Sequence, residues 1–168
     1  MNETLIKEIV HEAERIEEDA VHSGKSHYDA SFLWSTVHYL LGIPMTACAA
    51  WAGIDAFAEA PQFAGYLAMA TAALAALQTF INARSHASQH KQAGGEDLAL
   101  ENQVRLFRKI ELKILQQEEA TANIKTFSKK RDELNASAPS IPYLAYRLAQ
   151  FSINKGNTVY RVDKVQQK

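Results

Sequence analysis

The sequence predicts an all-α membrane protein: a two-transmembrane helical hairpin with an N-terminal and a long C-terminal cytosolic helical region. Its 168 residues are rich in Ala, Leu, Glu, Lys and Gln and contain only seven Gly and four Pro, which favours helices over a loop-rich β fold. Two long segments carry no formal charge, and the charges around them are segregated by sign. This length is typical of one domain.

Charge divides the chain into unlike parts. Residues 1–29 carry eight acids and three bases, whereas residues 84–168 carry fifteen bases and nine acids. The total of 18 Lys and Arg against 19 Asp and Glu excludes the strongly basic balance typical of nucleic-acid binding, so no direct nucleic-acid partner is expected. The single cysteine, Cys48, excludes an intramolecular disulfide and a thiolate metal site.

The uncharged segments, residues 30–54 and 60–83, predict a transmembrane hairpin over residues 30–83. As helices they would each reach about 36 Å, and the hydrocarbon core of a bilayer is about 30 Å thick. A pair of buried helices in a soluble bundle with an Ala-rich core is the alternative. The turn between the segments holds no Lys or Arg, whereas Lys25, Arg84 and Lys91 flank the other ends. The positive-inside tendency therefore places both termini in the cytoplasm. No cleavable signal peptide is expected, because residues 1–29 lack an apolar core segment.

The first span carries a proline near its middle. Pro44 cannot donate a hydrogen bond to the carbonyl of Leu40, so we expect a loosened helix there, which is either a gate or merely a bend. Small residues at Ala49 and Gly53 would allow a neighbouring helix to approach closely.

The second span repeats alanine every fourth residue, at Ala64, Ala68, Ala72 and Ala76. This face is suited to close helix packing, either within the hairpin or between copies in a homo-oligomer. Gln78 and Asn82, one turn apart, would either line a pore mouth or form hydrogen bonds between helices.

The flanking segments read as cytosolic helices. Residues 1–29 predict an amphipathic helix that Ser23 and Gly24 close, and residues 84–153 predict a helical region that runs to about Leu134, breaks at NASAPSIP and ends in a short amphipathic helix, PYLAYRLAQF. The long helix is either continuous with the second span or broken at Gly94–Gly95, and we expect it to pack on the N-terminal helix. The apolar face of the N-terminal helix comprises Leu5, Ile6, Ile9, Ala13, Ile16 and Ala20. The apolar stripe of the long helix comprises Leu100, Val104, Phe107, Ile110, Ile114, Thr121 and Ile124. Residues 154–168 form a polar tail without a clear pattern.

Signs of catalysis are nearly absent. His86 and His90 share a helix face and could begin a metal site, but no further ligand motif completes it. Gly94–Gly95 follows no strand and fits no nucleotide-binding pattern. The sequence therefore predicts no enzyme, no cofactor and no metal.

The order of several short motifs resembles the SLATT domain family, two-transmembrane effectors associated with bacterial nucleotidyltransferase and nucleotide-sensing domains. The motifs are His27-Tyr28, HYLLGIP (38–44), AAWAG (49–53), LQTFIN (77–82), His90-x-x-Ala93-Gly94 and PSIPYLAY (139–146). Together they cover roughly residues 5 to 150, so the whole chain would be one SLATT-like domain.

The resemblance implies an antiphage defence effector of the bacterial inner membrane. Such a protein would oligomerise and permeabilise the membrane on a signal from a cytosolic partner, a nucleotidyltransferase with its cyclic-nucleotide signal or a reverse transcriptase. The chain lacks a recognisable sensor domain, which leaves the signal open. Two other readings stand beside this one: a membrane adaptor that only anchors a cytosolic partner, and the soluble bundle.

Overall fold

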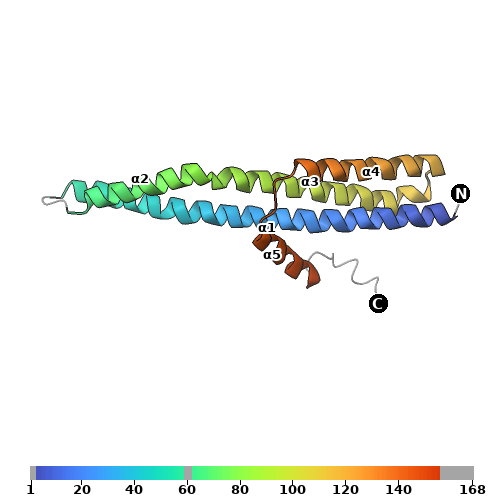
Figure 1. Ribbon diagram of the computed structural model, residues 1–168, viewed down its shortest axis with the longest axis horizontal. Helices are drawn as coiled ribbons and strands as arrows, with labels where there is room; N and C mark the ends of the chain where they lie inside the picture. The colour runs from blue at the N-terminus through green and yellow to red at the C-terminus, as the bar shows by residue number, and fades with distance from the viewer. Residues whose placement is uncertain (1–2, 59–61, 156–168) are drawn as a thin grey trace. The chain divides into compact units, whose positions relative to one another are not determined.

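The computed structural model describes residues 3–58 and 62–155, and within these ranges every regular element is a helix (Figure 1). The elements are α1 (Glu3–Ala56), α2 (Ala64–Ile81), α3 (Ala83–Lys109), the short 3-10 helix η1 (Glu111–Lys113), α4 (Gln117–Ser137) and α5 (Tyr143–Asn154). The predicted all-helical class is confirmed for this part of the chain. Most of the predicted polar tail, residues 156–168, and residues 59–61 of the predicted turn lie outside the described ranges.

The chain forms two compact units. Residues 1–30 and 89–168 make one, here called the head unit, and residues 31–88 make the other, here called the apolar unit. The boundaries fall close to the points where charge stops and resumes along the sequence, after Asp29 and before Arg84. Helices α1 and α3 contribute residues to both units.

The head unit is a helical bundle built from α1, α3 and α4 around one apolar core. Ile9, Ala13 and Ile16 of α1 face Leu100, Val104 and Phe107 of α3, and Ala120 and Ile124 of α4 complete the cluster. The predicted apolar face of the N-terminal helix and its packing on the long helix are both confirmed. The spacing of three and four residues explains this result, since it places these side chains on one face of each helix.

The predicted long helix is interrupted, which corrects the expectation of a run to Leu134. Helix α3 ends at Lys109, η1 turns the chain, and α4 begins at Gln117 and runs beside α3 (Figure 1). Gln116 and Glu119 form a capping box, in which each side chain accepts a hydrogen bond from the other residue's backbone N–H. Ile110 and Ile114, expected in the apolar stripe, are exposed, Ile114 by 81%, and Leu112 fills the core in their place.

Neither glycine site ends a helix, which corrects the expected helix end at Ser23 and Gly24 and rejects the alternative of a break at Gly94–Gly95. Helix α1 continues through Ser23 and Gly24, and α3 continues through Gly94 and Gly95. The break after the second span lies instead at Asn82, which ends α2 in the left-handed conformation with φ 48°. Asn tolerates that conformation better than most residues do. The break predicted at NASAPSIP is confirmed, since α4 ends at Ser137 and α5 begins at Tyr143.

Ion pairs join acidic residues of α1 to one arginine of α3 and one of α4. Arg108 of α3 makes two hydrogen bonds to the Glu17 carboxylate, at 2.6 and 2.9 Å, and a third to Glu14. Glu17 raises the pKa of Arg108 above its usual value. Arg131 of α4 lies 3.4 Å from Asp19. The segregation of charge along the sequence thus becomes attraction within the bundle.

Candidate functional site

The apolar unit exposes most of its large apolar side chains. Within the described residues α2 has no buried residue, and no residue is buried in either window that is long and apolar enough to cross a membrane. The exposed set is Phe32, Tyr39, Leu40, Ile43, Trp51, Ile54, Phe57, Phe63, Tyr66, Met69, Leu77 and Phe80. A core helix of a soluble bundle would be mostly covered, so this surface disfavours the soluble reading.

The partly covered residues of the apolar unit follow a regular spacing. In α1 they include Trp34, His38, Leu41, Met45, Cys48, Ala52 and Asp55, and in α2 they include Ala64, Leu67, Thr71, Leu74, Gln78 and Ile81. Alternating steps of four and three residues are typical of the seam between two antiparallel helices packed as in a coiled coil. This spacing is present in the sequence and could have identified the seam.

The alanine ladder lies mainly outside this seam. Ala68, Ala72 and Ala76 are exposed, and only Ala64 is partly covered. Ala49 and Gly53 of α1 are exposed as well. Within the described chain, therefore, α1 and α2 meet through the mixed seam, and the small residues remain accessible to other molecules.

Polar contacts occur at both ends of the seam. The Asp55 carboxylate accepts hydrogen bonds from the backbone N–H groups of Phe63 and Ala64, both at 2.8 Å, and so caps the start of α2. At the other end the rings of Trp34 and His86 stack with their centroids 4.7 Å apart. Asp55 was not singled out by the sequence, because the two backbone groups that it caps lie eight and nine residues later.

Gln78 lies in the seam opposite His38. Its Nε2 is 3.1 Å from His38 Nδ1, while its Oε1 is buried without a hydrogen-bond partner in the protein. Gly42 faces the same amide, since a Cβ at that position would lie 3.8 Å from Gln78 Nε2. A half-satisfied amide in apolar surroundings is costly, so Gln78 is the residue of the seam most in need of another partner.

The other candidate gate residues are exposed, whereas Gln78 is partly covered. Pro44 is exposed within a helix that continues past it, and Asn82 is exposed at the end of α2. The structure therefore does not bring Gln78 and Asn82 to one covered face. Of the two histidines that share a face of α3, His86 stacks on Trp34 and His90 is buried against His27.

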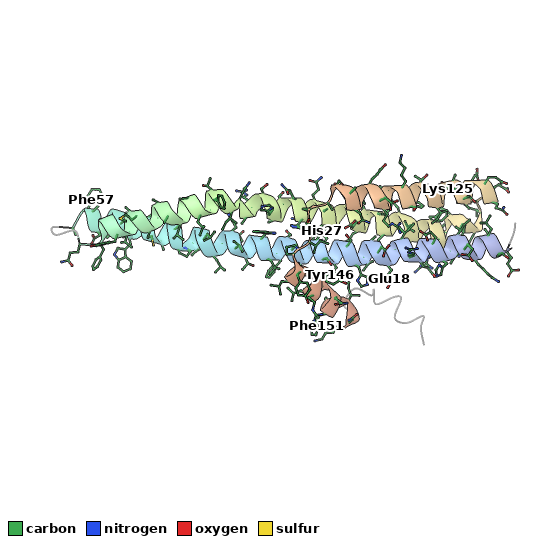
Figure 2. All side chains as sticks on the ribbon, viewed as in Figure 1. Glu18, His27, Phe57, Lys125, Tyr146 and Phe151 are labelled. Carbon is green, nitrogen blue, oxygen red and sulfur yellow. The ribbon has the colours of Figure 1, made fainter. Side chains whose placement is uncertain are left out.

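A buried pair of histidines, His27 of α1 and His90 of α3, forms a polar layer inside the head unit. The Nδ1 atoms of His27 and His90 are 2.9 Å apart, and the two side chains are 1% and 2% exposed. Figure 2 labels His27 on α1. Such a pair is a hydrogen bond when both rings are neutral, one ring donating and the other accepting. Burial, with a smaller contribution from His90, lowers the pKa of His27 from 6.5 to about 4.

Close helix approach accompanies this layer. A Cβ on Gly94 would lie 3.0 Å from the Gly24 carbonyl oxygen and 3.0 Å from the Tyr28 ring. Next to it, Asp97 is buried, and burial raises its pKa although the Ser23 hydroxyl donates a hydrogen bond to the carboxylate. The Asp97 Oδ2 atom has no partner in the protein. Asp97 also lines a groove of about 320 Å³ that extends to Leu134 and Pro139.

Two separate motifs of the sequence meet in this layer. His27 and Tyr28 belong to one motif and contact His90 and Gly94 of another, although more than sixty residues separate them. The HYLLGIP and LQTFIN segments meet in the same way in the apolar unit, through His38, Gly42 and Gln78. Sequence reasoning identified these residues as motifs and did not identify the contacts.

No protein-family model, no curated protein and no solved structure matches this chain. The described residues define a helical protein with two apolar helices that are compatible with crossing a membrane.

Proposed function

We propose that the chain is a SLATT-like membrane effector of bacterial antiphage defence. On a signal from a cytosolic partner, it oligomerises and permeabilises the inner membrane, which arrests or kills the cell. The observation that carries this proposal is the exposed apolar surface of residues 31–88, together with its exposed small-residue face. Lipid would cover the large side chains, and further copies would pack on the alanines.

Contacts between the motifs support the family assignment. Residues quoted from four separate segments form two compact sets, one around His27 and His90 and one around His38 and Gln78. Motifs that occur together because they build one structure are expected to meet in space. A chance collection of short matches carries no such expectation.

Activation would act through the continuous helix α1, which contributes to both units. A partner that binds one packing arrangement of the head unit better than another shifts the population toward that arrangement, and α1 transmits the change to the spans. In the altered oligomer Gln78 and Asn82 would face a water-filled opening, with Pro44 as the compliant point. The unpartnered Gln78 Oε1 would then gain water as its donor.

Membrane potential provides the test. Cells that express the chain with its genetic neighbours are challenged with phage, and potential is followed with a voltage-sensitive dye alongside growth. We expect depolarisation and arrest with the wild type, and a reduced effect with Pro44→Ala or Gln78→Leu at equal protein level. Ile43→Ala, an exposed residue beside Pro44, serves as the matched control and should depolarise like the wild type.

The adaptor reading predicts a different result. If the hairpin only anchors a toxic partner enzyme, growth stops while potential and dye exclusion are maintained, and none of these substitutions matters. That outcome would reject the pore and favour the adaptor.

A further inference from the structure

Helix α5 presents an apolar face that no other described residue of the head unit covers. Its small residues Ala145 and Ala149 are completely buried, so they form the face that packs against the protein. On the opposite side lie Tyr143, Leu144 and Phe151, with Leu148 at the flank. Tyr143 is 76% exposed and Phe151 61% exposed, and Figure 2 shows Phe151 on the outer side of the helix.

Basic residues accompany this apolar face. Arg147 lies in its middle, and the Lys155 Nζ atom sits 4.2 Å from the centre of the Phe151 ring. Residues 143–155 contain no Asp or Glu. A short helix with aromatic and aliphatic side chains on one face, and bases within reach of that face, is typical of helices that lie in the headgroup region of a membrane.

We propose that the exposed face of α5 lies on the surface of an anionic bilayer as an interfacial helix. Phe151, Leu144 and Leu148 enter the boundary between headgroups and acyl chains, while Arg147 and Lys155 bind lipid phosphates. The inference rests on the proposed membrane location of the chain, and it adds a third contact with the bilayer outside the two spans.

Charge favours lipid over a second copy of the same helix. A symmetric pairing of two α5 faces would bring Arg147 of each copy close to that of the other, with no acid on the helix to offset the repulsion. The phosphates of an anionic lipid surface complement both bases. Tyr143 and Tyr146 also suit the interface, since a phenol combines an apolar ring with a polar tip.

Site-specific fluorescence in vesicles tests the proposal. The full chain carries Cys48→Ala and one new cysteine labelled with an environment-sensitive dye, at Phe151 on α5, at Ile43 in the first uncharged segment or at Ala122 on the exposed side of α4. Each protein is reconstituted sparsely into vesicles of three parts phosphatidylcholine to one part phosphatidylglycerol. Lipids that carry a quencher near the headgroup or deep in the acyl chain then report the depth of each dye.

We expect the dye at position 151 to be quenched from the shallow position, the dye at 43 from the deep position, and the dye at 122 from neither. Replacing Arg147 and Lys155 with Gln should lower the ratio of docked to free α5 about fivefold for each base removed, the factor that corresponds to about 1 kcal/mol. In vesicles of pure phosphatidylcholine, which carry no net negative charge, the ratio of docked to free α5 should also fall.

The outcomes separate the two proposals. Quenching at 43 without quenching at 151 would overturn the interfacial helix and leave the membrane location intact. No quenching at either position would overturn both. A third outcome is a blue-shifted dye at position 151 that lipid quenchers do not reach. If its emission returns to that of an aqueous dye on dilution with empty vesicles, the face would be assigned to a second copy of the chain.

Discussion

At the scale of single residues, His27 in the head unit links stability to pH. Its ring is buried against His90, and burial lowers its pKa to about 4. The folded protein therefore holds this side chain neutral over a range in which the unfolded chain protonates it. Above pH 6.5 both states are neutral and the full stability is present. Between pH 6.5 and about 4 the unfolded state binds more protons, so stability falls as the pH falls.

We expect the free energy of unfolding to decrease by about 3 kcal/mol across this window, at about 1.4 kcal/mol for each pKa unit. His27→Gln, which does not titrate, should lose this part of the pH dependence. Thermal or denaturant unfolding of the purified chain in detergent, measured from pH 7.5 to 4, checks it. Asp97 is present in both proteins, so the difference between the two profiles reports the His27–His90 pair. Parallel profiles would mean that His27 is not held neutral.

At the scale of the helices, α1 approaches α3 closely at Gly94 and less closely at Gly95. A Cβ on Gly94 would meet the Gly24 carbonyl oxygen, which is backbone and cannot move alone, whereas a Cβ on Gly95 would meet only the Tyr28 hydroxyl, at 3.7 Å. Both glycines lie inside α3, so both gain the same helix propensity on replacement by alanine.

Gly94→Ala should therefore destabilise the head unit by about 1–3 kcal/mol, because the helices must separate. Gly95→Ala should be neutral or stabilise it by up to about 1 kcal/mol. Circular dichroism melts of the two variants in detergent give the comparison. Equal shifts in melting temperature would show that the contact at Gly94 does not limit how closely the helices pack.

Local periodicity predicted some helix features and misled on others. The face from Ile9 to Ile16 was predictable because one burial pattern persists over two turns. The turn after Lys109 was missed because Ile110 and Ile114 continue the apolar spacing, while the capping box at Gln116 and Glu119 was the signal that a new helix begins there. A break at Gly94–Gly95 was one of the alternatives because a glycine's cost to a helix is visible in the sequence, whereas its packing against Tyr28 is not.

Helix α2 of the apolar unit uses different faces for different contacts. Ala72 is exposed on the alanine ladder, and its neighbour Ala73 is exposed away from it, while Leu67 belongs to the seam with α1. A test of assembly between copies needs a control substitution that leaves the fold of one molecule intact. Leu67→Ala does not meet this condition, because it would disturb the seam within the molecule. Ala72 and Ala73 are a matched pair in residue type, exposure and helix.

We expect Ala72→Leu to weaken association between copies by about 1–3 kcal/mol, because a bulky side chain enters where backbones approach. Ala73→Leu should have a smaller effect. Chemical crosslinking in native membranes at several expression levels measures both. If the two variants crosslink equally well, the ladder reflects composition and is not an interface.

For the molecule as a whole, the division of charge and apolar surface was predictable from sequence, and the contacts between distant motifs were not. The positions of the charged residues along the sequence placed the uncharged segments between an acidic and a basic region. The boundaries of the two compact units lie close to the ends of these regions. The meeting of His27 with His90 depends on which helices pack together and in which register. A single sequence records neither, so the candidate site emerged only with the tertiary structure.

The last prediction concerns the orientation of the chain in the membrane. The segment that joins the two uncharged runs carries no Lys or Arg, and Asp55 within it caps α2. We therefore expect it to lie outside the cell, with the head unit in the cytoplasm. In a Cys48→Ala background, Ala58→Cys should react with an impermeant thiol reagent added to intact spheroplasts. Ala122→Cys, exposed on α4, should react only after lysis. The reverse pattern would place the head unit outside, where no cytosolic partner could reach it, and reaction of neither cysteine before lysis would mean that the hairpin does not cross the membrane.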